Sequence, residues 1–413
     1  MAKKKLLAIC DHPLSTSGVG VQARHLLMGL IETGDYSVIC YGGAIKHDEY
    51  KLTRVNDDFL IKPLNGFGTP ELIRDTIIAE QPDAVFIFTD PRFFNHIFNI
   101  EDEIHQVCPI TYWHVWDNGP YPDYNDWIYK SVDLFNCHSH LTYELVASHY
   151  PEKANFVPHA VPTDVFKKLP QKDIRQFRKQ LLGDQKKDNF VIMWVNRNAR
   201  RKKPNDVLHS FRDALRELEA NSEKPVNMSL VMHTDPTDKE GPNLLATAKM
   251  LGINENVIFS TGKLGFPEMN VLYNIADVTI NIACAEGFGL GTLESMQAGT
   301  PIIATTTGGL TRQVIDHRNG TENGVAIKPA VRALVGSQAV PYIYEDHVSN
   351  EDAAAAIVKI YSMSVEEREA LGEKARQYAL TQFRLEDTVR RWDETLSDTI
   401  EKFDYQRWTC TEL

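Results

Sequence analysis

Short apolar runs alternate with longer helical patterns along this chain, and this alternation constrains the fold more than any other feature. Such runs are typical of strands buried on both faces, and the repetition of strand, helix and strand predicts a parallel sheet covered by helices on both sides. Between the first two runs, residues 21–33 have the apolar spacing of a helix. In the first half of the chain, strands are expected at residues 6–10, 37–41, 84–88, 110–114, 134–137 and 155–157.

The pattern starts again in the second half, after a polar segment with a helical stretch at 174–182. Further strands are expected at residues 190–195, 228–233, 257–260, 278–282 and 301–304. Because 413 residues exceed one ordinary core, we predict an α/β fold of two Rossmann-like doubly wound domains that face each other across a cleft. The expected parts are an N-terminal domain at 1–165, a C-terminal domain at 166–385, and a helix and tail at 386–413 that pack back on the N-terminal domain.

Charge and cysteine usage narrow the functional classes. The net charge of -12 at pH 7 argues against a broad contact with nucleic-acid phosphates, because such binders usually present basic surfaces. The six cysteines lack the paired spacing of metal ligands, so we expect reduced core thiols of a cytosolic protein. The sequence has no apolar stretch long enough for a membrane span and no signal-peptide pattern at its start. We expect a cytoplasmic protein, with a peripheral position at the inner membrane face left open.

The first candidate site is a glycine loop after the opening strand. Gly18 and Gly20 stand in the sequence Ser-Thr-Ser-Gly-Val-Gly, directly before a helical pattern. Glycines let the backbone approach a phosphate, and the amides and dipole of a helix N-terminus favour negative charge. The loop lacks the third glycine of a dinucleotide fingerprint and the Lys-Ser/Thr pair of a P-loop. A plain strand-to-helix turn is therefore the alternative interpretation.

The second candidate is a basic run at the equivalent place in the second half. Residues 197–203 hold five cations among seven residues, directly after an expected strand. A diphosphate needs such partners, above all as a leaving group on which negative charge develops. A solvated basic turn is the alternative, and Arg200, Arg201 and Lys203 fit it even if Arg197 and Lys202 bind a ligand.

The third candidate is a glycine-rich turn between two glutamates. Residues 286–294 read Glu-Gly-Phe-Gly-Leu-Gly-Thr-Leu-Glu at an expected strand-to-helix junction. The turn frees backbone N–H groups for a phosphate or a sugar, and a carboxylate is the matching acceptor for the hydroxyls of a sugar or a ribose. Glu286 precedes the turn, and Glu294 lies about one turn into the helix.

These motifs resemble the signature of retaining GT-B glycosyltransferases, in the large family often called family 4. The two glutamates with seven residues between them, the Arg197-x4-Lys202 pair and residues 156–162 carry the resemblance, the last being similar to the family's interdomain Pro-Asn-Gly-Val-Asp element. The resemblance implies that Glu286 binds the donor sugar and Glu294 the ribose. It also implies that Arg197 and Lys202 hold the diphosphate.

The resemblance implies further donor contacts in both domains. Gly18 and Gly20 are expected to close over the diphosphate, while Gly262, Lys263 and Leu264 are expected near the base. The backbone around the glycine-rich turn is expected to contact the sugar and phosphates, at Gly287, Phe288, Gly289 and Leu290. Two departures from the family pattern are Lys203-Pro204, in place of the usual glycine after the lysine, and His159-Ala160, in place of Asn-Gly.

Residues 112–120 contain a further candidate, His114, at the end of an expected strand. Its position matches the histidine that family members place beside the reacting sugar, so it joins Glu286, Arg197 and Lys202 as an expected catalytic residue. A satisfied core histidine is the alternative. Trp113, Trp116 and Asp117 are the expected acceptor contacts, although the aromatic side chains fit a packed domain wall equally well. Acceptor specificity is expected in the loops at 46–68 and 91–100.

The function implied is transfer of a hexose or similar sugar, with retention, from a UDP- or GDP-sugar to a hydroxyl of a glycan, lipid or small-molecule acceptor. Cations at the leaving group would replace a metal, and Asp235 and Asp238 have the wrong spacing for an Asp-x-Asp pair. We therefore predict no metal-ligand residues and no required cofactor. The alternatives are a nucleic-acid-modifying glycosyltransferase, a sugar-nucleotide epimerase of the same fold and an inactive sugar-nucleotide sensor. The stretch 328–348 is longer than a typical family member needs, and no motif in it suggests a role.

Overall fold

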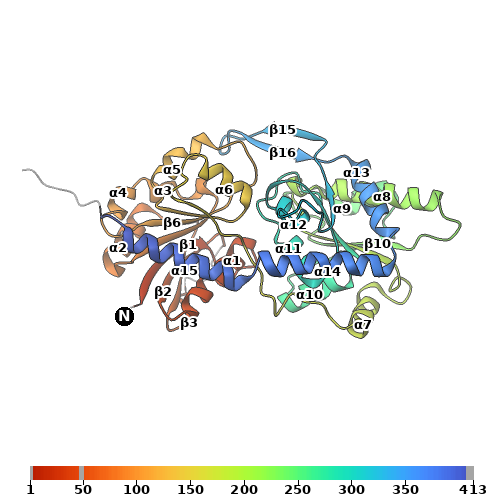
Figure 1. Cartoon of the computed structure of the whole chain (residues 1–413), viewed down its shortest axis with the longest axis horizontal. Coiled ribbons are helices and arrows are strands. Elements are labelled where there is room, and N and C mark those ends of the chain that lie inside the picture. The colour runs from red at the N-terminus through yellow and green to blue at the C-terminus, as the bar shows by residue number, and fades with distance from the viewer. Residues whose placement is uncertain (1–2, 46–50, 406–413) are drawn as a thin grey trace, which may run out of the picture. The chain divides into compact units, whose positions relative to one another are not determined.

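The computed structural model describes residues 3–45 and 51–405, in which the chain divides into two compact units (Figure 1). The first unit combines residues up to Ala160 with Gly336–Ile343 and the residues from Leu385 onward. The second unit holds Val161–Val335 and Tyr344–Arg384. The boundary thus falls at Ala160 and not at the expected residue 165, and a short segment near residue 340 belongs to the first unit. Cys410, the end of the C-terminal tail and part of the loop at 46–68 lie outside the described residues.

A largely parallel sheet forms the centre of the first unit. Within the described residues it has eight strands in the order β3-β4-β2-β1-β5-β6-β7-β8, and every neighbouring pair is parallel except β3 and β4. The expected strands are present, while β3 and β4 were not predicted. The strands are β1 (Lys4–Asp11), β2 (Tyr36–Gly43), β3 (Thr53–Asn56), β4 (Phe59–Pro63), β5 (Ala84–Thr89), β6 (Ile110–His114), β7 (Leu134–Cys137) and β8 (Ala154–Phe156).

Helices from both ends of the chain cover this sheet. The last helix, α15, lies beside α1, the first one (Figure 1). Its Trp392 is fully buried and packs edge-on against Phe86 and Trp113 of the sheet. The helices of the first unit are α1 (Gly18–Glu32), α2 (Pro70–Glu80), α3 (Asn95–Phe98), α4 (Glu101–Ile104), α5 (Asp126–Lys130), α6 (His140–Ala147) and α15 (Leu385–Lys402), with short 3-10 turns η1 (Pro91–Phe93) and η2 (Asp123–Asn125).

The second unit is built on a fully parallel sheet. Its order is β11-β10-β9-β12-β13-β14. Counted from its own first strand, this order is 3-2-1-4-5-6, the doubly wound order of nucleotide-binding sheets. The strands are β9 (Phe190–Val195), β10 (Met228–His233), β11 (Val257–Ser260), β12 (Val278–Asn281), β13 (Ile302–Thr305) and β14 (Val325–Ile327).

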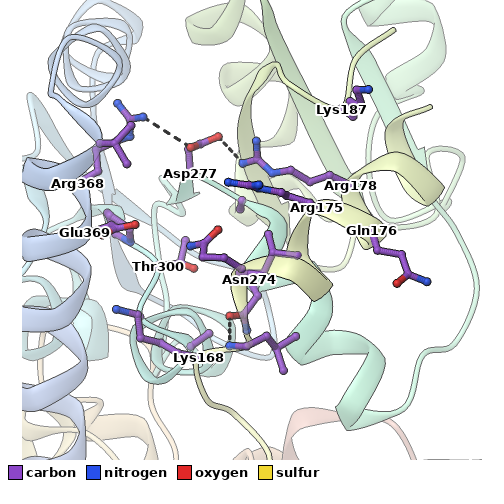
Figure 2. A pocket seen from close by; sticks show the side chains of 18 of the residues that line it. Lys168, Arg175, Gln176, Arg178, Lys187, Asn274, Asp277, Thr300, Arg368 and Glu369 are labelled. Carbon is purple, nitrogen blue, oxygen red and sulfur yellow. Dashed lines mark hydrogen bonds and ion pairs between the residues drawn. The ribbon is translucent and has the colours of Figure 1, made fainter. Parts of the chain in front are cut away.

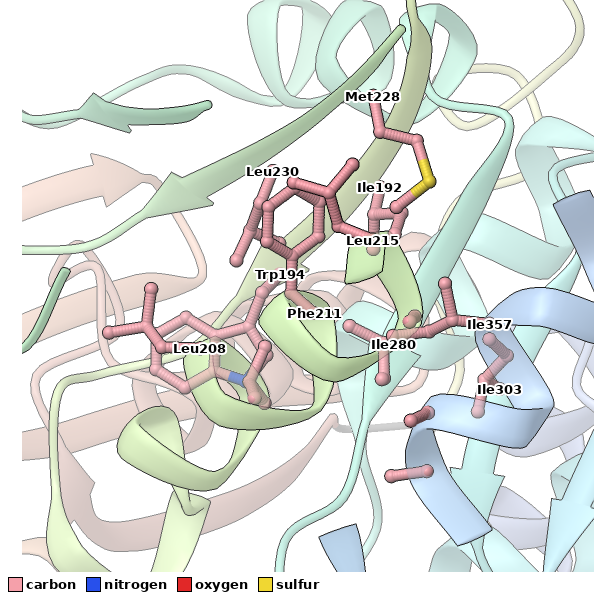
Figure 3. Packing of buried hydrophobic residues seen from close by; sticks show 14 of the residues in the cluster. Ile192, Trp194, Leu208, Phe211, Leu215, Met228, Leu230, Ile280, Ile303 and Ile357 are labelled. Atoms are coloured by element: carbon pink, nitrogen blue, oxygen red, sulfur yellow. The ribbon is translucent and has the colours of Figure 1, made fainter. Parts of the chain in front are cut away.

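The main core of the second unit lies between this sheet and the helices α8 and α13. Trp194 of β9 is fully buried beside Phe211 of α8, and Ile357 of α13 packs in the same cluster (Figure 3). These side chains hold the strands so that their carboxyl ends form a fixed edge. The helices of the second unit are α7 (Gln171–Leu182), η3 (Arg200–Lys202), α8 (Pro204–Ala220), α9 (Leu244–Leu251), α10 (Phe266–Ile275), α11 (Leu290–Ala298), η4 (Gly308–Leu310), α12 (Thr311–Val314), α13 (Asn350–Tyr361) and α14 (Val365–Gln382).

The stretch at 328–348, for which the sequence suggested no role, contains a two-stranded sheet of β15 (Val331–Val335) and β16 (Ile343–His347). Between these strands, Tyr342 belongs to the first unit. There its hydroxyl donates a 3.0 Å hydrogen bond to Asp123, and its ring packs edge-on against Tyr124. The additional length therefore has a defined packing partner. Over the residues described, no helix combines the length and the apolar character needed to cross a bilayer.

Candidate functional site

The strand order of the second unit creates a switch point between β9 and β12. From β9 the chain continues to β10 on one side, and from β12 it continues to β13 on the other side. In sheets of this kind, ligands bind beyond the carboxyl ends of the strands where the connections diverge. The loop after β9 carries the basic run, and the loop after β12 carries Glu286. The structure therefore brings the second and third sequence candidates to one edge of one sheet.

Lys202 and Glu286 form an ion pair that joins these two loops, with the lysine Nζ donating to the glutamate Oε2. Both residues are buried, with 8% of each exposed. Two further hydrogen bonds hold the loops together: the Arg201 guanidinium donates to the carbonyl of Ala285 at 2.9 Å, and the Cys284 N–H donates to the carbonyl of Arg201 at 2.9 Å. A cation and a carboxylate are thus fixed at the place where a sheet of this type binds phosphates.

The departure from the family pattern at Lys203-Pro204 has a visible effect on the backbone. Lys203 follows η3 with φ +57 and lies in the left-handed region, directly before Pro204 begins α8. Glycine adopts this conformation without steric cost, whereas a lysine does not. The backbone after η3 thus has a conformation that favours glycine, although a lysine occupies the position.

Arg197 stands apart from the buried ion pair. Its side chain is 65% exposed, and its Nε donates to Oδ2 of Asp238 at 2.8 Å. The hydrogen bond to Asp238 raises the pKa of Arg197, and the same bond lowers the pKa of Asp238. The aspartate that has the wrong spacing for a metal-binding pair is therefore the partner of a predicted diphosphate ligand. The structure brings Lys202 and Glu286 together and leaves Arg197 in a separate surface pair.

The glycine-rich turn is shaped by close packing. Gly289 has φ +91, and a Cβ added to it would lie 2.4 Å from Cδ2 of Leu310. A Cβ on Gly309 would lie 2.4 Å from Cα of Phe288 and 2.5 Å from the carbonyl oxygen of Gly287. At Gly309 only glycine fits without displacing the turn, and at Gly289 the positive φ favours glycine.

The turn leads directly into α11, which begins at Leu290. Its N-cap is Gly289, for which the structure shows no side-chain cap. The first amides of a helix have no intrahelical acceptors, so they are available to an anion at this end. Within the turn, the Gly309 N–H donates to the carbonyl of Glu286 at 3.0 Å, and the Gln313 side chain donates to the carbonyl of Phe288 at 2.7 Å. The backbone of the predicted donor loop is therefore fixed by its own neighbours.

Glu294 lies on α11 and is partly buried beside Tyr273 of α10. The Tyr273 hydroxyl donates to Oε2 of Glu294 at 2.7 Å. Burial raises the pKa of Glu294 to about 7, although the hydrogen bond from Tyr273 acts in the opposite direction. A carboxyl group that changes charge near neutral pH is unusual, and such groups cluster at functional sites.

Gly262, Lys263 and Leu264 follow β11, the outermost strand on one side of the sheet. Gly262 and Lys263 are exposed, and Leu264 is half-buried. Gly262 has φ +102 and would accept a Cβ without any contact within 4 Å. The segment leaves the same carboxyl edge of the sheet as the ion pair, at the end of its own strand.

In the first unit, the predicted glycine loop follows β1. The Ser17 hydroxyl accepts from the Gly20 N–H at 3.0 Å and donates to Asp11 at 2.7 Å, so Ser17 caps α1. A Cβ on Gly20 would lie 2.5 Å from the carbonyl oxygen of His12, so packing alone requires glycine here. Gly18 is exposed at the first position of the helix. The two glycines therefore have different surroundings.

His114 ends β6 and is fully enclosed in the first unit. Its Nε2 and the Tyr129 hydroxyl lie 2.8 Å apart, and its ring also contacts Tyr112 and Phe135. Burial holds the pKa of His114 well below its usual range, with a smaller contribution from His138. The side chain is therefore neutral at physiological pH.

The three predicted acceptor contacts differ in exposure. Trp113 is 1% exposed, stacks on Phe88 and donates from its indole to the carbonyl of Val157 at 3.2 Å. This packing favours the alternative interpretation, in which Trp113 builds the domain wall. Trp116 is also buried, and Asp117 is half-buried after the end of β6.

The structure brings together a further group that the sequence did not reveal. Ligand atoms of Cys284, Glu345 and His347 all lie within 4.8 Å of one another in the second unit. Two of these residues are on β16, more than fifty positions from the third, so no spacing pattern connects them. Glu345 also accepts two hydrogen bonds from the Arg200 guanidinium, at 2.6 and 3.2 Å.

A pocket of about 990 Å³ in the second unit also lies outside the predicted site (Figure 2). Its wall includes Asp277, which accepts from Arg178 at 2.7 Å and lies 3.9 Å from Arg368. Asp277 precedes β12, and Pro301, also in the wall, precedes β13. The pocket is therefore at the amino ends of these strands, opposite the edge that carries Lys202 and Glu286.

Comparison with known proteins finds a matching family model and curated relatives that cover part of the chain. Residues 174–339 match the family model described as Glycosyl transferases group 1. The D-inositol 3-phosphate glycosyltransferase of Acidothermus cellulolyticus is 29% identical over 233 residues, which cover 53% of this chain and 50% of that protein. The chain thus spans about half the length of the curated relatives it matches.

Solved structures extend the likeness to the whole fold. Sucrose-phosphate synthase from Thermosynechococcus elongatus has a TM-score of 0.72 at 15% identity, over 97% of this chain and 100% of that one. The Anabaena HepE protein in complex with UDP and glucose has a TM-score of 0.68 at 16% identity, over 96% and 100%. The shared architecture of two Rossmann-like units is the GT-B fold. Residues 174–339, which include the ion pair at the switch point, match the model of the glycosyl transferases group 1 family.

Proposed function

We propose that this protein is a retaining glycosyltransferase that moves a hexose or similar sugar from a nucleotide diphosphate sugar to a hydroxyl acceptor. The buried Lys202–Glu286 pair at the switch point, next to the start of α11, is the observation that carries the proposal. A cation, a carboxylate and the amides of a helix N-terminus at one sheet edge match the chemistry of a diphosphate joined to a sugar. The match of residues 174–339 to the group 1 family supports the same assignment.

In this proposal, Lys202 binds the diphosphate of the donor. Its Nζ is bonded to Glu286, so an arriving diphosphate competes with that carboxylate for the ammonium protons. The exchange leaves Glu286 ready to accept hydrogen bonds from sugar hydroxyls, which links recognition of the phosphates to recognition of the sugar. Arg197 would turn from Asp238 to the phosphates, since an exposed ion pair is worth little and is easily exchanged.

Glu294 is proposed to bind the ribose. Tyr273 occupies its Oε2, so we assign Oε1 to a ribose hydroxyl. The amides at the start of α11 and the turn from Gly287 to Leu290 would contact the phosphates and the sugar. Gly262, Lys263 and Leu264 would lie near the base. From the first unit, the proposal uses Gly18 and Gly20 for the diphosphate.

The proposed reaction needs no carboxylate nucleophile. The diphosphate departs with the stabilisation of Lys202 and Arg197, and the anomeric carbon gains positive character. The acceptor hydroxyl then attacks from the same face, and its proton passes to the departing phosphate. His114 is neutral, so its proposed role beside the sugar is to hydrogen-bond and not to supply charge.

The named relatives guide the choice of substrates to test first. HepE of Anabaena is solved with UDP and with UDP-glucose, so UDP-sugars are the first donors, with GDP-sugars as the comparison. The curated relative is named for D-inositol 3-phosphate, so a phosphorylated polyol is included among the acceptors. From the first unit, Trp116 and Asp117 are the proposed acceptor contacts, while the buried Trp113 is assigned to the core of the domain.

The test measures the affinity of the purified protein for a panel of UDP-, GDP- and ADP-sugars by calorimetry. We expect one sugar nucleotide to bind, and the Lys202→Ala and Glu294→Ala variants to bind it at least tenfold more weakly. Transfer to an acceptor, with retention seen by NMR of the product, would separate the enzyme from a sensor or an epimerase. Unchanged affinity of both variants for every sugar nucleotide would refute the proposal.

A further inference from the structure

Three side chains of the second unit meet next to the segments that carry the Lys202–Glu286 pair. Cys284 precedes Glu286 by two positions, and Glu345 and His347 lie on β16. A sulfur, a carboxylate oxygen and a ring nitrogen lie within 4.8 Å of one another. In the part of the chain that the structure describes, this is the one group of three or more such ligands that comes this close.

We propose that Cys284, Glu345 and His347 form a binding site for Zn²⁺. Thiolate, carboxylate and imidazole are the ligand types that zinc takes, at bond lengths of about 2.0–2.3 Å. A tetrahedral site with such bonds places its ligand atoms roughly 3.5 Å apart, so rotation of the side chains needs to close a gap of roughly 1 Å. Magnesium and calcium prefer sites made of oxygen alone, so the mixed set of ligands disfavours both and fits zinc.

The backbone holds the three ligands in place. The Asp346 N–H, between the two ligands on β16, donates to the carbonyl of Cys284 at 2.7 Å. The Cys284 N–H in turn donates to the carbonyl of Arg201. Cys284 is fully buried, whereas 26% of the His347 side chain is exposed. The site therefore has a rigid inner ligand and an outer ligand at the surface through which a metal ion can enter.

Arg200 donates hydrogen bonds to Glu345, one of the proposed zinc ligands, but does not prevent a metal ion from reaching it. The guanidinium donates to Oε1 at 2.6 Å and to Oε2 at 3.2 Å, while Nε2 of His347 lies 3.4 Å from Oε2. A zinc ion beside His347 would take Oε2 and replace the longer of the two arginine bonds. The Arg200 side chain is 70% exposed, so the guanidinium has room to turn outward into water.

The site is coupled to both loops of the buried ion pair. Arg200 begins the 3-10 turn that ends at Lys202, and Cys284 stands two residues before Glu286. Zinc binding would displace one bond of Arg200 and turn the Cys284 side chain toward Glu345 and His347 of β16. We therefore expect zinc to weaken nucleotide-sugar binding, an effect that rests on the proposed function, whereas binding of the metal does not depend on it.

Titration of the full chain with Co²⁺ tests the site directly, because a cobalt–thiolate bond absorbs in the near ultraviolet. We expect this band in the wild type and in Cys108→Ser, a control for a buried cysteine of the first unit. The band is expected to be lost in Cys284→Ser. A titration without the band, or a band that survives in Cys284→Ser, would overturn the proposal.

Calorimetry with Zn²⁺ gives a second, independent measurement. We expect one equivalent to bind the wild type, and the affinity to fall at least tenfold in His347→Gln but not in His209→Gln, which changes a half-exposed histidine of α8. Since His347 is partly exposed, its replacement is expected to leave the melting temperature unchanged, so a loss of affinity cannot come from unfolding. Equal zinc affinity in the two histidine variants would refute the site. Zinc binding without any sugar-nucleotide binding would instead refute the proposed function and leave the site intact.

Discussion

The hydroxyl of Tyr273 donates a 2.7 Å hydrogen bond to Glu294, and burial raises the pKa of this glutamate to about 7. The proposed ribose ligand therefore changes charge close to neutral pH. An ionised carboxylate accepts hydrogen bonds from hydroxyl groups more strongly than a protonated one. The pH of the solution should consequently control the part of donor affinity that depends on Glu294.

We expect donor affinity of the wild type to rise as pH increases from about 6 to 8, because Glu294 becomes ionised in this range. Glu294→Gln should bind the donor more weakly and with a flat profile over the same range. Calorimetry at each pH measures the effect, and Glu219→Gln, at an exposed position of α8, provides the control. If Glu294→Gln showed the same pH dependence of donor affinity as the wild type, Glu294 would not be the titrating ligand.

The same group affects stability. Its pKa is raised above the ordinary value of 4.5, so the native state binds the proton more tightly than the unfolded state. The cost of ionising Glu294 is absent below about pH 4.5, grows as pH rises, and is fully present above about pH 7. Across this pH range, the unfolding free energy of Glu294→Gln, measured with urea, should increase relative to that of the wild type, by at most on the order of 3 kcal/mol.

Removing one partner of the buried ion pair should be strongly destabilising. Lys202→Met leaves Glu286 buried without its cation, which costs about 3–5 kcal/mol of unfolding free energy. The double variant with Glu286→Gln should recover part of this loss, because it removes the unpaired charge. Lys187→Met, which breaks a half-exposed pair of 3.8 Å, should cost less than about 1 kcal/mol. If Lys202→Met and Lys187→Met lowered the unfolding free energy equally, the buried pair would contribute no more to stability than the half-exposed one.

The donor turn should tolerate no side chain at Gly309. A Cβ there would lie 2.4 Å from Cα of Phe288, so Gly309→Ala has to displace the backbone of the turn. We expect donor affinity to fall at least tenfold. Gly252→Ala is the matched control, because its Cβ would meet no atom within 4 Å and only its φ of +73 carries a cost, about 1 kcal/mol. The prediction fails if both variants bind the donor as the wild type does.

Replacement of Lys203 by glycine should not destabilise the protein. The left-handed backbone at φ +57 costs a lysine about 1 kcal/mol, which offsets the chain entropy that a glycine loses on folding. Gln176→Gly, at an exposed position in the middle of α7, has no such compensation and should lose about 1 kcal/mol. Urea unfolding of the two variants gives the comparison, and equal destabilisation would contradict the strain assigned to Lys203.

Transfer activity should persist in the presence of a chelator. The proposed reaction stabilises the leaving diphosphate with Lys202 and Arg197, so no divalent ion is expected to be required. Activity after EDTA treatment and dialysis measures this, and a chelator that removes zinc from the site at Cys284 should leave activity equal or higher. Activity that EDTA abolishes and magnesium restores would contradict the prediction.

The sequence predicted the buried parts of the fold well. Every expected strand is present, because runs such as residues 84–88 and 190–195 are apolar throughout and have one stable location, inside a parallel sheet. The strands β3, β4, β14, β15 and β16 were not predicted. Val331 and Leu334 of β15 are exposed, so burial leaves no pattern there that a sequence can show.

The site was only partly predictable, for reasons of distance along the chain. Glu286 and the glycine turn are contiguous, so their spacing was informative. Arg197 pairs with Asp238, and Cys284 lies next to Glu345 and His347, which are more than fifty residues away in the sequence. Only the folded chain brings such residues together. Trp113 shows a further limit, since an aromatic side chain at a strand end has the same sequence pattern whether it faces a ligand or a core.

The position of Trp392 has a consequence for the order of folding. This side chain and Leu396, both from α15, complete one core cluster of the first unit, whose other buried members lie between Leu6 and Val157. During synthesis, one apolar face of this sheet therefore remains partly uncovered until α15 has been made, after all residues of the second unit. All residues of the second unit precede α15 in the sequence, so this unit can complete its core earlier. We therefore expect the second unit to reach its native state before the first.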